Sequence, residues 1–461
     1  MAEPWREVTR PSESSDVADR TALTRELSLF DALMINVGTT LGSAIFIVPA
    51  IIIANVGTAF MSGVVWIIAG VLSWFGAVTF AELAVLYPRA GGEYVYLEKA
   101  YTRFWGFLYG WTLFSVIQTA SIAAVAVAFM TYLDYFVPMS PTILNMSAIG
   151  LILILSIWNC ISLRTSANTQ NSTTVAKLVL VAIMVASCFW YGGDGVNAFR
   201  QMVPTDPATR TVAGFGAAMV AALWAFDGWV SVTFVGGEVK DPSRALPRAL
   251  SYSALGLIGI YLLITNGYIY ALPVGEMAIS ERVAADAVEN VLGNVGGGLV
   301  SLAVAVSCFA ALNGFIFTGA RVYYAMALDG AFFGWAAKLS ARKIPVYAIV
   351  AQGIWASALV LTGRYDQLFT YVVFTSWLFY MLGAFGVIVL RYREPHRPRP
   401  YRAFGYPGIP VFFAVFAAAL LLQTLWDNPR DSLIGLGIML IGVPAYYYWT
   451  RNPDGHARSS S

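Results

Sequence analysis

Charge is scarce in this sequence. Only 12% of its 461 residues are charged, while 58% are hydrophobic. Soluble domains carry about 25% charged residues, roughly twice this share. The composition therefore excludes a disordered chain and an ordinary soluble enzyme. The formal net charge is only +2, so the chain has no strong positive electrostatic field that would favour nucleic acid as a partner.

Cysteine and histidine are also scarce. The 3 cysteines, Cys160, Cys188 and Cys308, lie in apolar stretches, and their odd number excludes a fully paired disulfide framework. The 2 histidines, His396 and His456, lie in polar segments, so histidine-based metal or triad chemistry is poorly supplied. Phosphate-binding, zinc-protease and serine-hydrolase motifs are missing as well. We therefore expect a protein that is not an enzyme and needs no metal or cofactor.

Long apolar runs are what the sequence has in abundance. A helix needs about 20 mainly apolar residues to cross the ~30 Å core of a bilayer. These runs are too long for barrel strands and do not alternate, so we predict an all-α polytopic membrane protein. The twelve predicted transmembrane helices are 29–54, 59–86, 103–134, 144–163, 172–191, 212–236, 251–271, 296–322, 345–363, 366–391, 405–425 and 433–449.

Basic residues divide unevenly between alternate loops. Of the 28 lysines and arginines, 22 fall on one side and 5 on the other, with Lys177 inside a span. Cytoplasmic loops carry the excess of basic residues, so both termini are expected in the cytoplasm, with the chain in the cell (inner) membrane. Residues 1–27 lack the apolar core of a cleaved signal peptide. They and residues 450–461 are predicted to be cytoplasmic tails.

Two predicted spans contain internal helix breakers. The first reads Gly-Thr-Thr-Leu-Gly-Ser-Ala-Ile-Phe at 38–46, and the sixth reads Leu-Trp-Ala-Phe-Asp-Gly-Trp at 223–229. If the first five spans form one repeat, the sixth begins the second, and the breaks occupy matching places. Paired interrupted helices indicate a transporter site near the bilayer midplane. The alternative is that the glycines only allow close helix packing.

The residues at these breaks suit a zwitterionic α-amino acid. A half-helix beginning after Gly42 offers free N–H groups and a positive dipole end to a carboxylate. Ser43 and Ala44 are small enough to let a ligand reach the backbone. Asp227 and the unwound carbonyls of the sixth span suit an ammonium group or a cationic side chain. Alternatively, Asp227 serves as a structural carboxylate bonded to the unwound backbone.

Other residues in the spans allow more than one interpretation. Lys177 either replaces a bound sodium ion by donating to carbonyls, changes protonation during transport, or extends to the interface. Glu82 is close to the cytoplasmic end of its span, where water can solvate it. Trp224 and Phe226 either line a pocket or pack between helices.

Several motifs together resemble those of one transporter family. They lie at 38–46, 81–94, 159–178, 224–247, 313–321 and 377–380. Over about residues 28 to 450, the chain resembles the L-type amino-acid transporters of the amino acid–polyamine–organocation superfamily. The resemblance implies a LeuT-type fold, with a 5+5 inverted repeat, discontinuous helices 1 and 6, and two peripheral helices. The first repeat would span 28–191, the second 212–391, and the peripheral pair 392–449.

The resemblance also implies secondary active transport of L-amino acids by alternating access, most often as sodium-independent exchange. The alternatives are a proton-coupled symporter, with Lys177, Asp227 or Glu82 as the proton carrier, and a sensor that binds without translocating. Two kinds of partner are expected, the amino-acid substrate and the lipid bilayer.

Site residues follow from the same resemblance. Backbone at Gly42, Ser43 and Ala44 would hold the carboxylate. Lys177 matches the family lysine near the sodium position of sodium-coupled relatives. Thr40, Trp224 and Asp227 sit where the family holds the amino group. Phe226 is also predicted to bind substrate, from its place at the sixth break rather than from the resemblance.

The chain departs from the family pattern in two places. Ala44 replaces a family glycine and narrows the expected pocket floor. Animal members bind a heavy chain through a cysteine after the third span, but residues 135–144 contain none. We therefore expect no disulfide-linked heavy chain, as in a bacterial-type transporter that works alone.

Overall fold

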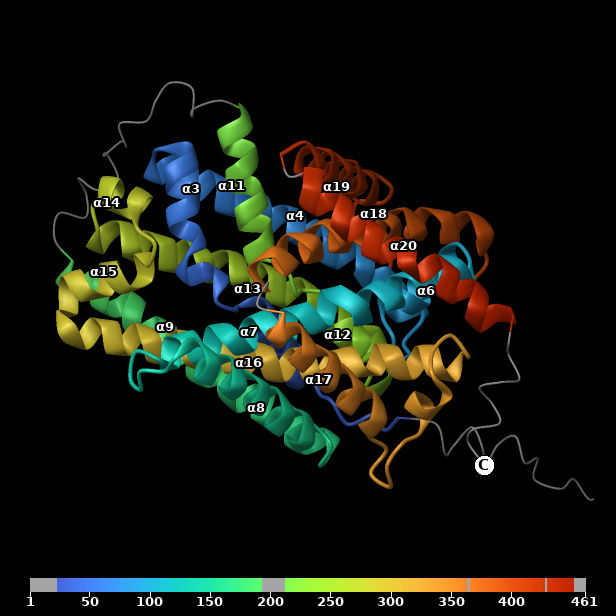
Figure 1. The fold of residues 1–461 in the computed structure, drawn as a ribbon. Helices are drawn as coiled ribbons and strands as arrows, with labels where there is room; N and C mark the ends of the chain where they lie inside the picture. The colour runs from blue at the N-terminus through green and yellow to red at the C-terminus, as the bar shows by residue number, and fades with distance from the viewer. Residues whose placement is uncertain (1–22, 193–211, 363–364, 428, 452–461) are drawn as a thin grey trace, which may run out of the picture.

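The computed structural model describes residues 23–192, 212–362, 365–427 and 429–451. Within these ranges the secondary structure is helical, apart from one parallel bridge between Leu27 and Val239. Most of the long helices run side by side between the two ends of the molecule (Figure 1). The all-α prediction is therefore confirmed. Most of the two predicted tails lies outside the described residues.

Nine helices in the described part of the chain are long and apolar enough to cross a membrane. The third of the predicted spans is a continuous run of α6 (Arg103–Thr112), the π-helical turn η2 (Leu113–Ile117) and α7 (Gln118–Leu133). The other eight are α4 (Ala59–Leu86), α8 (Pro141–Asn159), α9 (Leu163–Tyr191), α13 (Pro242–Ala271), α16 (Asn294–Leu328), α18 (Tyr365–Arg393), α19 (Gly408–Asp427) and α20 (Pro429–Arg451).

The three remaining predicted spans contain shorter helices. The ninth is α17 (Val346–Leu361), with only 16 residues. The first consists of α2 (Leu29–Thr40), the 3₁₀ turn η1 (Ala44–Phe46) and α3 (Val48–Val56). The sixth consists of α11 (Val212–Ala225), α12 (Ser231–Phe234) and the turn η4 (Gly236–Glu238). Both predicted interruptions are thus present.

Several helices extend beyond the apolar runs that predicted them. α9 begins at Leu163 rather than 172, because the Ser162 hydroxyl caps it by accepting a hydrogen bond from the N–H of Thr165. α13 begins at Pro242, since proline suits the first turn of a helix. Short helices also occupy predicted loops: α5 (Glu93–Ala100), α14 (Val274–Ile279), α15 (Val283–Leu292) and η5 (Gly334–Ala337). Hydropathy detects the lipid-buried part of a helix and misses its polar ends.

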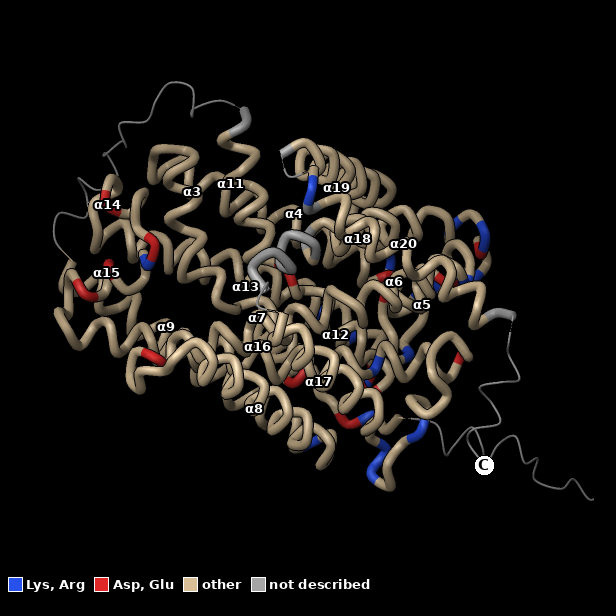
Figure 2. Tube along the Cα trace, in the orientation of Figure 1, with Lys and Arg blue, Asp and Glu red and all other residues tan. Residues whose placement is uncertain are grey.

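The two broken spans lie against each other in opposite directions. α3 packs on α11, whereas α12 packs on α2 (Figure 1). The first half of one span therefore neighbours the second half of the other, and the two breaks meet between them. Charged residues are distributed unevenly between the two ends of the molecule. In Figure 2, basic residues gather toward the end that holds α5 and α6, and acidic residues predominate around α14 and α15 at the other.

A buried ion pair joins the segments next to the breaks. The Arg321 guanidinium contacts the Glu238 carboxylate at 2.9 and 3.1 Å, and both side chains are almost fully buried. The backbone carbonyl of Glu238 also accepts the N–H groups of Glu26 and Leu27. This pair therefore fastens α16, the end of the sixth span and the segment that precedes α2.

Replacing Arg321 by methionine is expected to destabilise the protein strongly. It leaves the Glu238 carboxylate buried without its counter-charge, and breaking such a pair costs about 3–5 kcal/mol. The midpoint of thermal unfolding in detergent should fall by several degrees. Arg244→Met is the matched control, because its pair with Asp241 is exposed, 3.8 Å long, and worth about 0–1 kcal/mol. Equal midpoints for the two variants would contradict the structural importance of the buried pair.

Candidate functional site

The two breaks border one cavity of about 150 Å³. An apolar cavity of that size admits benzene, so this cavity is of the scale of a small organic ligand. Its walls come from both broken spans, α5, the third span, α16 and α18. From the two breaks the lining residues are Thr39, Thr40, Gly42, Ser43, Ala44, Trp224, Asp227 and Gly228.

Lys177 binds backbone carbonyl groups of the first break, outside the cavity lining. Its ammonium group donates to the carbonyl oxygens of Gly38, at 2.7 Å, and Leu41, at 2.6 Å. The side chain is fully buried, so it does not extend to the interface. Lys177 does not line the cavity; it holds the carbonyls freed where α2 ends.

Two hydroxyl groups hold further carbonyls of the breaks. Ser307 on α16 donates to the carbonyl oxygen of Leu41 at 2.8 Å. The Tyr261 hydroxyl lies 2.5 Å from the carbonyl oxygen of Ala225 and 3.2 Å from that of Thr40. Because those carbonyls end α11 and α2, one tyrosine on α13 links both interruptions. Unwound backbone inside a membrane needs such partners.

Backbone N–H groups of the first break remain available. Those of Ser43, Ala44 and Ile45 have no hydrogen-bond acceptor within the described residues. A Cβ atom added at Gly42 would meet open space rather than a neighbour. The first break therefore offers unused donors beside an unfilled volume, the arrangement that suits an anionic group.

The sixth break brings a carboxylate to the cavity wall. One oxygen of Asp227 accepts the N–H of Gly228 at 3.0 Å and the hydroxyl of Tyr380 at 2.6 Å. Gly228 has φ +109°, and a Cβ there would lie 3.2 Å from the backbone of Thr40. Only glycine suits both the backbone angle and this close approach, so Gly228 lets the two breaks touch.

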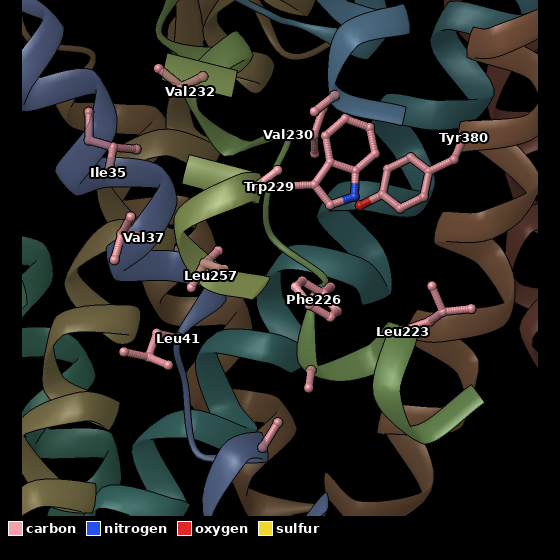
Figure 3. Close-up of a cluster of buried hydrophobic side chains, with 14 of the residues drawn as sticks. Ile35, Val37, Leu41, Leu223, Phe226, Trp229, Val230, Val232, Leu257 and Tyr380 are labelled. Carbon is pink, nitrogen blue, oxygen red and sulfur yellow. The ribbon is translucent and has the colours of Figure 1, made fainter. Parts of the chain in front are cut away.

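The predicted aromatic residues do not all reach the cavity. Trp224 lines it, whereas Phe226 is buried behind it against the Tyr261 ring, with ring centroids 4.8 Å apart. Figure 3 shows Phe226 among apolar side chains and Trp229 beside Tyr380. The structure thus brings together Thr40, Gly42, Ser43, Ala44, Trp224 and Asp227, and leaves Phe226 and Lys177 outside the cavity wall.

Sequence reasoning missed the wall that the third span contributes. The π-helical turn η2 lies in this span, and Leu113 and Ile117 at its two ends line the cavity. Such turns are frequent at functional sites, but no sequence pattern announces them. Gln118 lines the cavity and also donates to the Phe315 carbonyl at 2.7 Å, which links the third span to α16. Glu93, Tyr109 and Tyr380 were missed as well.

Glu82 does not lie in water as expected. It is fully buried, and its oxygens lie 2.6 Å from Arg391 and 3.2 Å from Arg399. The N–H of Ala403 also donates to it, at 2.7 Å. Two guanidinium groups therefore hold this carboxylate, which is not part of the cavity lining. It ties α4 to the end of α18 and the segment after it.

Antiparallel broken helices around a small cavity that contains a few polar groups define a membrane transporter of the discontinuous-helix class. Residues 27–443 match the family model described as "Amino acid permease". The chain therefore belongs to the amino acid permease family of the amino acid–polyamine–organocation superfamily. The resemblance to L-type members is confirmed, and the protein is a transporter rather than an enzyme.

Curated relatives resemble the chain along nearly its whole length. The serine/threonine exchanger SteT of Bacillus subtilis is 30% identical, with 92% of this chain and 97% of the relative covered. The human large neutral amino acids transporter small subunit 2 is 31% identical, with 94% and 82% covered. The human b(0,+)-type amino acid transporter 1 is 30% identical, with 96% and 91% covered.

Proposed function

We propose that this protein exchanges L-amino acids across the cell membrane, and that it binds them between the two broken spans. One observation carries the proposal. The cavity lining includes Ser43 and Ala44, whose N–H groups are unused, and Asp227, which carries a carboxylate. N–H donors and a carboxylate around one small cavity match the two charged groups of an α-amino acid. Relatives named as exchangers and amino-acid transporters support the same substrate class.

The substrate pose follows from these walls. The α-carboxylate lies against the backbone at Gly42, Ser43 and Ala44. The α-ammonium lies toward Thr40 and Asp227, and Trp224 forms the wall beside it. Thr40 supports this assignment, because its buried hydroxyl oxygen has no hydrogen-bond partner in the described part of the chain.

Transport is proposed to be independent of sodium. Unwound carbonyls are the groups that coordinate Na⁺ in transporters with broken helices. Here the Lys177 ammonium already occupies the carbonyls of Gly38 and Leu41. The Lys177 amino group therefore fills the place that a bound cation would take.

The proposed architecture has twelve spans in a 5+5 inverted repeat, with both termini in the cytoplasm of the cell or inner membrane. Residues 28–191 and 212–391 form the repeats, and 392–449 form two peripheral helices. The antiparallel packing of the broken spans supports the inversion. The two repeats rock about the cavity, which opens to each side in turn.

The protein is proposed to work without a disulfide-linked heavy chain. Residues 135–144, between the third and fourth spans, contain no cysteine. The three cysteines of the chain are free thiols, and two of them, Cys188 and Cys308, are buried.

Purified protein in liposomes tests the exchange. Labelled amino acids are offered as a panel to vesicles that are empty or preloaded with unlabelled amino acid, in sodium or choline buffer. We expect uptake at least about tenfold faster with internal substrate and equal in the two buffers. Uptake driven by a pH gradient into empty vesicles would instead show symport. Binding without any flux would show a sensor, and either result would overturn exchange.

A further inference from the structure

Glu93 lines the cavity but has no part in the pose above. It begins α5 directly after Gly91 and Gly92, whose φ values of +114° and +48° turn the chain sharply. The N–H of Gly91 donates to the carbonyl of Phe234, the last residue of α12, at 3.1 Å. A Cβ at Gly92 would lie 2.6 Å from the Phe234 ring. The two glycines thus allow this turn to pack closely against the end of α12. The turn places Glu93 in the cavity wall.

One oxygen of the Glu93 carboxylate lacks a partner. The other accepts the Tyr109 hydroxyl at 2.6 Å. The side chain is only 2% exposed, and its second oxygen has no hydrogen-bond donor within the described ranges. Leaving a buried carboxylate oxygen unpaired is costly, so native sites normally supply a donor. In a cavity wall, the donor that fits is a group on the ligand.

The cavity is acidic beyond the needs of a neutral amino acid. Asp227 and Glu93 each accept a tyrosine hydroxyl at 2.6 Å, from Tyr380 and Tyr109. The described residues that line the cavity include no lysine or arginine. A neutral amino acid offers one cationic group, its α-ammonium, and in the proposed pose that group faces Asp227. It therefore leaves the second oxygen of Glu93 without a hydrogen-bond donor.

We propose that Glu93 forms a subsite for a cationic substrate side chain in the same cavity as Asp227, so that basic amino acids are the preferred substrates. The inference rests on the proposed function, because it assumes an amino acid in this cavity. Asp227 faces the α-ammonium, and the unpartnered oxygen of Glu93 accepts the side-chain guanidinium or ammonium. Charge-assisted hydrogen bonds of this kind are about twice as strong as neutral ones.

The subsite makes a prediction about pH. Burial raises the pKa of Glu93 to about 8; the Tyr109 hydrogen bond opposes this, and the negative charge of Asp227 adds to it. The other titratable groups that it faces are Tyr96 and Tyr380. Glu93 is therefore mostly protonated near pH 7 in the empty site and must lose its proton to pair with a cation. Apparent affinity for a cationic substrate should rise with pH up to about 8 and then level off.

L-Arginine and L-citrulline provide the test, because they have nearly the same shape and differ in side-chain charge. Exchange of each is measured in proteoliposomes of the full chain, with wild type and Glu93→Gln. We expect wild type to prefer arginine at least tenfold in apparent KM, and the variant to lose most of that preference while citrulline exchange is retained. Between about pH 6 and pH 8 the wild-type preference should increase several-fold.

Glu98→Gln is the matched control on the same helix. Glu98 pairs with Arg89 at 3.1 Å and does not line the cavity, so the ratio of arginine to citrulline should stay as in wild type. Equal loss of both substrates in Glu93→Gln would show that Glu93 serves the pathway as a whole, which overturns the subsite. A wild-type ratio in Glu93→Gln would overturn it as well.

The outcomes separate this inference from the proposed function. If neutral amino acids exchange and arginine does not, the subsite fails while the exchanger stands. If no amino acid of the panel exchanges, the proposed function itself fails. Should Glu93→Gln not fold, the pH profile of the wild-type ratio decides alone, since a ratio that is constant from about pH 6 to pH 8 contradicts the subsite.

Discussion

Lys177→Met is expected to reduce amino-acid exchange by at least 100-fold. Methionine keeps most of the packing volume and removes the ammonium that donates to Gly38 and Leu41 at 2.7 and 2.6 Å. Each hydrogen bond from a charged donor is worth about 1.5–3 kcal/mol, so two of them hold the break by at least about 3 kcal/mol. Each 1.4 kcal/mol corresponds to a factor of about ten in an equilibrium constant, so a loss of about 3 kcal/mol corresponds to about 100-fold. Initial rates of counterflow in preloaded proteoliposomes measure the loss.

Lys99→Met is the control for the loss of a lysine. Lys99 belongs to α5, is 42% exposed in its side chain, and lies 3.7 Å from Glu98. Its exchange rate should stay within about twofold of wild type, since exposed pairs contribute about 0–1 kcal/mol. The Lys177→Met protein must also elute as a folded monodisperse species for the comparison to hold. A folded variant with wild-type exchange would remove Lys177 from the mechanism.

The apolar runs predicted most of the architecture because lipid leaves so few structural choices. Nine long helices and both broken spans follow from hydropathy and from helix-breaking residues. α5, α14 and α15 were missed, since they are short helices whose stability comes from tertiary packing rather than from an apolar run. The 16-residue α17 and the early start of α9 show the same limit at the helix ends.

The sequence predicted a site residue only where that residue differs clearly from its apolar, helix-forming neighbours. Asp227 and Lys177 stand out as charges within apolar sequence, and Gly42 stands out as a breaker. Glu93 does not stand out, because it follows a polar loop where acidic residues are ordinary. Its place in the cavity depends on the turn at Gly91 and on the end of α12, which lies about 140 residues further along the chain.

Phe226 illustrates the opposite error. Its sequence neighbours Trp224 and Asp227 both line the cavity, so proximity suggested that it does too. A broken helix does not keep a fixed periodicity, however, and the chain after Ala225 turns Phe226 toward Tyr261. Which side chain points into a site at an unwound segment depends on the local backbone angles, and the sequence pattern does not specify those.

Gly42→Leu is expected to abolish substrate binding. Gly42 is the cavity residue whose added Cβ meets nothing within 4 Å, so the backbone there tolerates a side chain. That side chain would fill much of a cavity of about 150 Å³, at the point proposed for the α-carboxylate. We expect apparent affinity to fall by 100-fold or more, equivalent to about 3 kcal/mol. Gly42→Ala, which adds one carbon, should lose about tenfold. Counterflow titrations of external substrate measure both.

Gly256→Leu separates occupation of the cavity from a general effect of leucine for glycine. Gly256 is exposed on α13, and a Cβ there also meets open space, but that space lies outside the cavity. Exchange by Gly256→Leu should therefore match wild type, while thermal unfolding of both leucine variants should change little. The graded order of glycine, alanine and leucine at position 42 tests the pose most directly. Wild-type affinity in Gly42→Leu would place the substrate carboxylate elsewhere, because a bound amino acid and the leucine side chain cannot occupy one volume.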